Sequence, residues 1–333
     1  MGRTTPPPPL DVTSVFPELG PLARQAVRLH PRAGAPGPND SSLGGPLLWP
    51  ADQPWPACQE PHDRCERFPV PPNITSWDQA VQWGRAAGVG VLRQGDGPIY
   101  AERWYYQSPE VPSPMTGVLQ LRARDVPELP FPEHTDLFQL LWCPNQHAAP
   151  WYGPRPLTVW RRAAEVTEPL SAPPTPRFDE ELFGPDYVPL SCVLHPERVV
   201  EYPHRYSLPA ELVERIEQWD ERHDDLYWAE LSTAPGTKVG GHPRWIQEPQ
   251  WPQCRCGRRM QHLLTIASDE FGARGRWLPL EDRDDPTIAT SRPVLGQERW
   301  PPHGLMLGDL GSLYLFTCVV CVERPLAGTM QCS

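Results

Sequence analysis

The chain has 333 residues and a formal net charge of −11, and 47 of its residues are proline. This is about three times the proline content of ordinary proteins, and it excludes a long helical bundle or coiled coil because proline breaks helix interiors. The 14 Trp, 9 Tyr and 8 Phe argue against a disordered chain, and the acidic balance argues against nucleic-acid binding, which needs a basic face.

Short helices and strands are predicted along the chain. Residues 21–29 (PLARQAVRL) fit a short helix with a proline at its first position. Residues 76–88 fit a helix with Ser76 as the N-cap and Gly88 as the stop, and residues 210–220 (AELVERIEQWD) place apolar side chains at helical spacing. Apolar runs predict strands at residues 117–121, 137–142, 157–160, 262–267 and 312–320. We therefore expect a β-rich α+β fold with short helices and long proline-rich loops.

One block of sequence occurs twice. Residues 44–58 (GGPLLWPADQPWPAC) and residues 240–254 (GGHPRWIQEPQWPQC) both fit the pattern GG-x3-W-x5-W-P-x-C without a gap. Each copy is followed by a strand led by methionine and then by a strand that ends in cysteine. We interpret this order as an internal duplication that produces two lobes.

The duplication predicts three parts of the chain. Residues 1–42 form an N-terminal extension with a short helix, and residues 43–170 form the first lobe, which carries a helical insertion. Residues 171–333 form the second lobe. The proline-rich stretch at residues 165–178 (EVTEPLSAPPTPRF) contains the boundary between the lobes.

The second lobe contains two close pairs of cysteines. Cys254 and Cys256 are separated by one residue, and Cys318 and Cys321 by two. Four thiolates in two such pairs suit a structural tetrahedral zinc ion, and Gly257 is typical of the turn that follows a ligand cysteine. The alternative is two pairs of free or redox-active thiols.

The first lobe has a matching but less regular set. Cys58 and Cys143 correspond to Cys254 and Cys318, and His147 follows Cys143 where Cys321 follows Cys318. We predict a second zinc site made of Cys58, Cys65, Cys143 and His147, with His62 as an alternative ligand. The other interpretation is a degenerate site with ordinary buried cysteines.

Other residues give no catalytic signature. The chain has no phosphate-binding loop, no G-x-G-x-x-G, no G-x-S-x-G and no H-E-x-x-H motif. Cys192 and Cys332 have no counterparts in the repeat. We expect the repeated tryptophans to form the core beneath each metal, with stacking on a sugar or peptide as the alternative.

The repeated motifs resemble a known family. The blocks are K-V-G-G-H-P-R-W at residues 238–245, C-x-C-G-x-x-M-x-x-L-L at residues 254–264 and G-D-x-G-x-L-Y-L-F at residues 308–316. They are similar to the bacterial YwqG-like proteins of unknown function and, more distantly, to the programmed cell death protein 2 family. That family usually has glutamine where Thr265 stands, and Gln120 keeps it in the first copy. The eukaryotic relatives are regarded as dedicated chaperones for a ribosomal protein, so the resemblance implies a chaperone-like role.

These observations lead to a functional hypothesis. We expect a non-enzymatic protein, stabilised by structural zinc, that binds a protein or peptide client, and the acidic charge favours a basic client. The alternatives are a metal-assisted hydrolase that uses the first-lobe site and an immunity or antitoxin-type partner. Residues 1–9 (MGRTTPPPP) lack the apolar core of a signal peptide, and no apolar run is long enough to cross a membrane, so we expect a cytoplasmic location.

Overall fold

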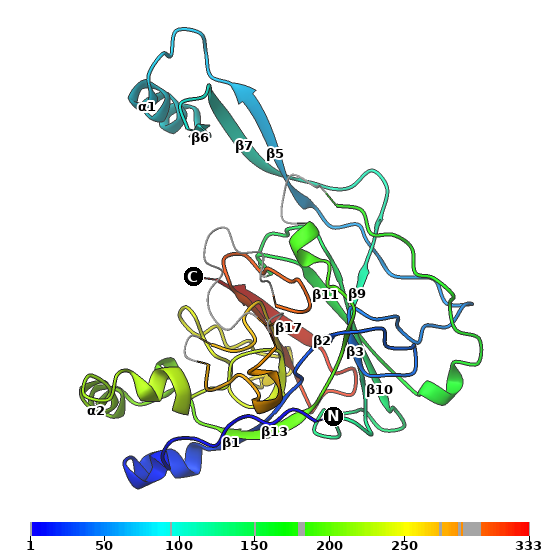
Figure 1. The fold of residues 1–333 in the computed structure, drawn as a ribbon. Helices are drawn as coiled ribbons and strands as arrows, with labels where there is room; N and C mark the ends of the chain where they lie inside the picture. Colours follow the sequence, from blue (N-terminus) through cyan, green and yellow to red (C-terminus); the bar gives the residue numbers. More distant parts are fainter. Residues whose placement is uncertain are drawn as a thin grey trace.

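The computed structural model describes residues 2–93, 95–149, 151–178, 184–272, 275–285, 288 and 301–332. Two six-stranded antiparallel sheets form the body of the molecule, and a smaller sheet with a helix extends away from it (Figure 1). The prediction of a β-rich α+β fold with short helices is confirmed. Within the described residues, no helix has the length and apolar character needed to cross a membrane.

Sheet A contains the strands of the second copy of the repeated block. Its strand order is β13-β1-β14-β15-β16-β17. The bounds in that order are Glu197–Glu201, Arg24–Arg28, Lys238–Gly240, Gln261–Ala267, Ser312–Thr317 and Leu326–Gln331. The strands predicted at residues 262–267 and 312–320 are β15 and β16.

Sheet B contains the strands of the first copy. Its strand order, read from the opposite end, is β2-β12-β3-β9-β10-β11. The bounds in that order are Arg32–Ala33, Cys192–Val193, Ser42–Leu43, Thr116–Arg122, Leu137–Cys143 and Arg155–Arg161. In both sheets four strands from one half of the chain lie in consecutive order, and the other two are one further strand from that half and one from the other half: β13 and β1 in sheet A, β2 and β12 in sheet B. The two copies of the block therefore occupy equivalent places in the two sheets.

A two-stranded ribbon runs through both sheets. In sheet A, β1 pairs with β13 and matches Arg28 with Glu197, whereas in sheet B, β2 pairs with β12 and matches Arg32 with Val193. The same register thus continues from one sheet into the other. Because β1 also pairs with β14, and β12 with β3, each sheet includes strands from both halves of the sequence.

The main hydrophobic core lies between the two sheets. It includes Val239, Leu264 and Leu313 from sheet A together with Leu119 and Leu140 from sheet B, and all five side chains are buried. The strands predicted at residues 117–121, 137–142 and 157–160 are β9, β10 and β11, and the first two contribute to this core.

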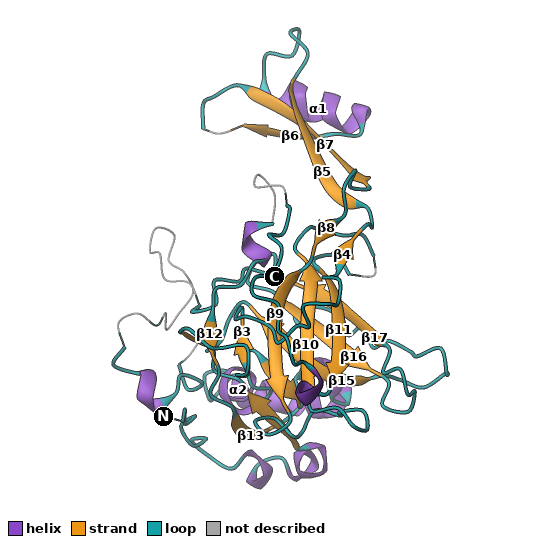
Figure 2. Cartoon of the chain, turned by 90° about the vertical axis from the view of Figure 1, so that its right-hand side faces the viewer, coloured by secondary structure: helices purple, strands orange, loops and turns teal. Residues whose placement is uncertain are grey.

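The insertion in the first half forms an arm, which we define as residues 62–107. It consists of a sheet with the order β5-β7-β6 and one helix, α1. The bounds are His62–Pro69 for β5, Trp77–Ala87 for α1, Gly90–Arg93 for β6 and Ile99–Gln107 for β7. Figures 1 and 2 both show the arm extending from the two-sheet body. A short pair, β4 (Ala57–Cys58) with β8 (Ser113–Pro114), lies in the chain on either side of the arm.

The helix predictions had mixed outcomes. Helix α1 begins after Ser76, whose side chain accepts a hydrogen bond from the Gln79 N–H, and it ends at Gly88 in the left-handed conformation, as predicted. Helix α2 (Ala210–Asp220) is also confirmed. The helix predicted at residues 21–29 is wrong, because a 3-10 turn (Pro17–Leu22) is followed there by strand β1. Further 3-10 turns are Val12–Ser14, Ala163–Glu165, Pro185–Tyr187, Arg205–Ser207 and Leu280–Asp282, and Tyr227–Leu231 is a π-helical turn.

Candidate metal centres

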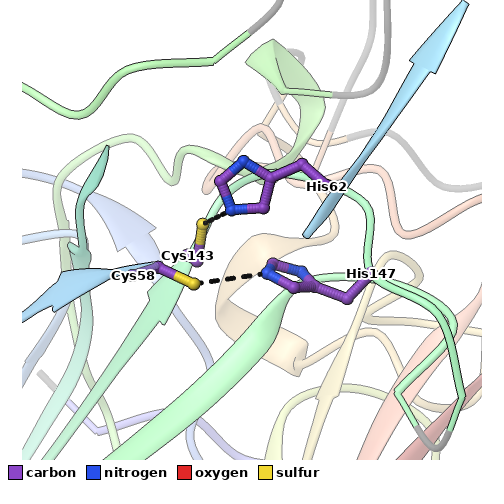
Figure 3. Close-up of side chains that lie close together, drawn as sticks. All are labelled: Cys58, His62, Cys143 and His147. Carbon is purple, nitrogen blue, oxygen red and sulfur yellow. Dashed lines mark hydrogen bonds between the residues drawn. The ribbon is translucent and has the colours of Figure 1, made fainter. Parts of the chain in front are cut away.

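Four side chains from different elements meet at the base of the arm, and we call this group centre 1. Cys58 lies on β4, His62 begins β5, Cys143 ends β10, and His147 follows in the next loop. Figure 3 shows the two sulfurs and the two imidazole rings turned toward one another. One ligand atom from each of the four residues lies within 4.8 Å of the others, so the group could hold a metal ion.

The donors of centre 1 are closely spaced and buried. Cys58 Sγ lies 3.5 Å from His147 Nε2, and Cys143 Sγ lies 3.3 Å from His62 Nε2. None of the four residues is more than 3% exposed. The Cys143 thiol shares a hydrogen bond with Cys58, which lowers the pKa of Cys58 and raises that of Cys143. The Cys58 thiol therefore ionises more readily than an ordinary cysteine, and the thiolate is the form that binds metal.

Neighbouring groups orient the ligands of centre 1. His147 Nδ1 lies 3.2 Å from the Gly153 carbonyl oxygen, which favours a proton on Nδ1 and leaves Nε2 free to bind a metal. The Asn145 amide lies 3.4 Å from Cys143 Sγ and can donate to it. Such outer contacts hold ligands in place and are typical of metal sites.

The structure selects between the two ligands that the sequence proposed for the fourth position. Cys58, Cys143 and His147 come together as expected, but Cys65 is not a member of the group, and His62 is. Residues 62–69 form an extended strand, in which three residues span roughly 10 Å, so Cys65 lies well along the arm when His62 is at the centre. In the antiparallel pairing of β5 with β7, Cys65 lies opposite Trp104.

The four predicted cysteines of the second half also come together, and we call this group centre 2. Cys254 Sγ lies 3.6 Å from Cys321 Sγ, and Cys256 Sγ lies 3.6 Å from Cys318 Sγ. All four sulfurs lie within 4.8 Å of one another. None of the nine cysteines is in a disulfide. Unlike centre 1, this group reaches the surface, because Cys256 is exposed.

Tight turns carry the sulfurs of centre 2. The Gly257 N–H donates to the Cys254 carbonyl over 2.8 Å, and Gly257 adopts a φ of 81°, which suits glycine. At the other pair, the backbone N–H groups of Cys321 and Val320 point to the Cys318 sulfur and lower its pKa to about 6. Such amide contacts stabilise the thiolate that a metal requires.

The two centres have equivalent surroundings. In centre 1, Trp49, Trp55 and Met115 pack with Cys58, and in centre 2, Trp245, Trp251 and Met260 pack with Cys254. The backbone also matches, because the Met115 N–H donates to the Pro56 carbonyl over 2.9 Å and the Met260 N–H donates to the Pro252 carbonyl over 3.0 Å. The repeated tryptophans therefore belong to the core beside each centre, as predicted.

A buried ion pair lies beside the second glycine pair and was not predicted. Lys238 Nζ donates to both carboxylate oxygens of Glu201 over 2.9 and 2.7 Å, and both side chains are almost fully buried. The Ala234 N–H also donates to Glu201. The sequence does show that Lys238 is the only lysine, but its partner is distant in the chain.

Comparison with known proteins adds no assignment. The chain matches no protein-family model and no curated protein. The two Cys/His groups are therefore the features on which a function can be based.

Proposed function

We propose that this protein is a zinc-stabilised, non-enzymatic module that binds a protein or peptide. The observation that carries the proposal is the pair of four-donor centres. A tetrahedral zinc ion with Zn–S of about 2.3 Å and Zn–N of about 2.0 Å separates two sulfurs by about 3.8 Å and a sulfur from a nitrogen by about 3.5 Å. The 3.6 Å sulfur pairs of centre 2 and the 3.3 and 3.5 Å contacts of centre 1 are close to these values.

Four protein donors favour a structural role for the metal. Catalytic zinc sites in general combine three protein ligands with a water molecule, whereas structural sites use four protein ligands. Centre 1 offers two sulfurs and two imidazoles, and all four residues are buried. The hydrolase alternative needs an open coordination position on the metal. In centre 1 the four protein donors would fill all four tetrahedral positions.

The binding role depends on charge and on the family resemblance. A net charge of −11 attracts basic polypeptides over a long range. The resemblance to the programmed cell death protein 2 family suggests a chaperone-like relationship with such a client, and an immunity-type partner would have the same electrostatic requirement.

Two measurements test the proposal. Metal analysis of the purified protein is expected to give two equivalents of zinc, and less than about half an equivalent with freely titratable thiols would contradict it. Affinity capture from the native host under mild conditions is expected to yield a basic polypeptide in stoichiometric amount. Recovery of an acidic partner, or metal-dependent hydrolysis of a small substrate by the purified protein, would count against a basic-client module.

A further inference from the structure

One face of the arm exposes aromatic side chains. Alternate residues of a strand point to the same side, so Tyr100, Glu102, Trp104 and Tyr106 of β7 share one face. Tyr100 is 38% exposed, Trp104 46% and Tyr106 52%. Isolated exposed aromatics are common, but three on one face of a single strand make this face a candidate interaction surface. We call these four residues, with Asp63, the arm face.

Helix α1 covers the opposite side of the arm sheet. Ala101 of β7 is fully buried, and Val91 of β6 is its paired neighbour. A Cβ atom added to Gly84 of α1 would come within 2.9 Å of Val91 Cγ1, so the helix packs closely on this side. The arm face points the other way, and its aromatics remain exposed among the residues that the structure describes.

The charge of the arm face suits a cation. Asp63 lies opposite Tyr106 in the pairing of β5 with β7, and the two side chains are hydrogen-bonded to each other. Arg67 lies opposite Glu102 and on the same face, and because its Nε lies 2.8 Å from that carboxylate the two charges offset each other, so Asp63 supplies the remaining negative charge of this face. On the opposite face, Arg103 lies 3.9 Å from Glu66. Aromatic faces beside a carboxylate attract arginine and lysine side chains, whereas phosphate groups would be repelled.

The arm is absent from the second half of the molecule. Cys58 and Met115 are separated by 56 residues, but their counterparts Cys254 and Met260 are separated by five. Centre 2 and sheet A thus form without any such element. Apart from His62, no residue of the arm belongs to the described hydrophobic clusters of the body or to either metal centre, so the rest of the insertion is free to serve binding.

Centre 1 fixes the base of the arm. His62 is both a member of the centre and the first residue of β5. The next residue, Asp63, donates its N–H to the Gln146 carbonyl over 2.9 Å, and Gln146 is adjacent to His147. The arm face therefore begins directly beside the metal centre and is held by it.

We propose that the arm face is the docking surface for an arginine- or lysine-rich segment of a partner polypeptide. The basic side chains stack on Trp104 and Tyr106, and Asp63 supplies the opposing charge. This inference rests on the proposed function, because it names where a basic client binds.

The test is selection of a random 12-residue peptide library on the intact metal-loaded protein. Enriched peptides are expected to carry several arginines or lysines. Their affinity should fall about tenfold or more in the double variant Trp104→Ser with Tyr106→Ser, and less strongly in Asp63→Asn. The matched control is Tyr105→Ser, which removes an aromatic of similar exposure, 42%, from the opposite face of the same strand and should bind normally.

The outcomes separate this inference from the proposed function. If basic peptides bind equally well to the double variant, the peptide-binding function stands and the arm face is excluded. If no peptide is enriched, both proposals fail. Enrichment of acidic peptides, binding of a single-stranded oligonucleotide that the double variant loses, or self-association through the arm would each overturn the assignment. Metal content and circular dichroism equal to those of the unaltered protein establish that the variants are folded.

Discussion

The fourth ligand of centre 1 shows how much a single residue decides. His62 and Cys65 lie on the same strand, but only His62 belongs to the four-donor group. We expect His62→Ala to reduce the zinc content of the purified protein from two equivalents to about one, because the centre loses a quarter of its donors. Cys65→Ser is the matched control and should retain two equivalents. Metal analysis by mass spectrometry makes the comparison, and the reverse result would restore Cys65 as the ligand.

The sequence indicated three of the four residues of centre 1 because they correspond to repeated positions. Cys58 and Cys143 align with cysteines of the second copy, and His147 follows Cys143 at a similar spacing. His62 does not align with a ligand of the second copy, so the sequence offered it only as an alternative. The second copy takes its remaining ligand, Cys256, from a tight turn, whereas the first copy enters strand β5 of the arm at His62. The choice between His62 and Cys65 depended on where a strand begins, and a sequence pattern rarely defines that to one residue.

A half-buried histidine gives a pH prediction. Burial, together with Arg244 and Arg205, lowers the pKa of His204 to about 3, and its Nδ1 atom has no hydrogen-bond partner among the described residues. Between pH 6.5 and 3 the unfolded chain binds a proton here that the folded chain does not. Stability is therefore present above pH 6.5 and is lost as the pH falls, by about 1.4 kcal/mol per pH unit.

Replacing this histidine by phenylalanine should remove that dependence. The ring packs against Trp228 at a centroid distance of 5.2 Å, and phenylalanine preserves such a contact. Between pH 7 and pH 5, we expect the free energy of unfolding of the unaltered protein to fall by about 2 kcal/mol more than that of His204→Phe. Urea titrations at the two pH values measure it. Parallel pH profiles would show that His204 is protonated in the folded state.

At the scale of elements, the arm behaves as an addition to the body. His62 and Gln107 are directly paired at its base, so residues 63–106 can be replaced by an Asn-Gly turn without moving the ligand. We expect this truncated protein to keep two zinc equivalents and a melting temperature within a few degrees of the full chain. Calorimetry and metal analysis provide the check. Loss of one zinc would mean that the arm also supports centre 1.

The elements that the sequence predicted correctly have strong local signals. Helix α1 has an N-cap serine and a stop glycine, helix α2 has an amphipathic pattern, and the long strands have apolar runs. The failure at residues 21–29 has a tertiary cause. The segment has an acceptable helical composition, but β1 hydrogen-bonds with β13 on one side and β14 on the other, and this pairing outweighs a weak helical preference. Its strand partners are more than 150 residues away, where local reasoning cannot find them.

At the scale of the whole molecule, the two-stranded ribbon that runs through both sheets makes the two halves depend on each other. Strand β1, from the start of the chain, lies inside sheet A between β13 and β14, and β12, from the second half, lies inside sheet B between β2 and β3. The two sheets also share one core. Two-residue strands such as β12 carry too little pattern to be predicted, so this sharing of strands between the two halves is visible only in the structure.

Separate expression of the two halves tests that dependence. Residues 171–333 alone contain centre 2 but lack β1, which would leave β14 and β13 without their shared neighbour and expose Val239, now 2% exposed. We expect this fragment to bind zinc weakly and to show no cooperative thermal transition, and residues 1–170 to behave likewise because they lack β12. Mixing or co-expressing the two fragments should restore a cooperative transition, since the ribbon and the shared core can then form. Calorimetry of each fragment and of the mixture measures this. A cooperative transition of residues 171–333 alone, with one tightly bound zinc, would instead show that the second half is an independent domain and that the ribbon only joins two finished lobes.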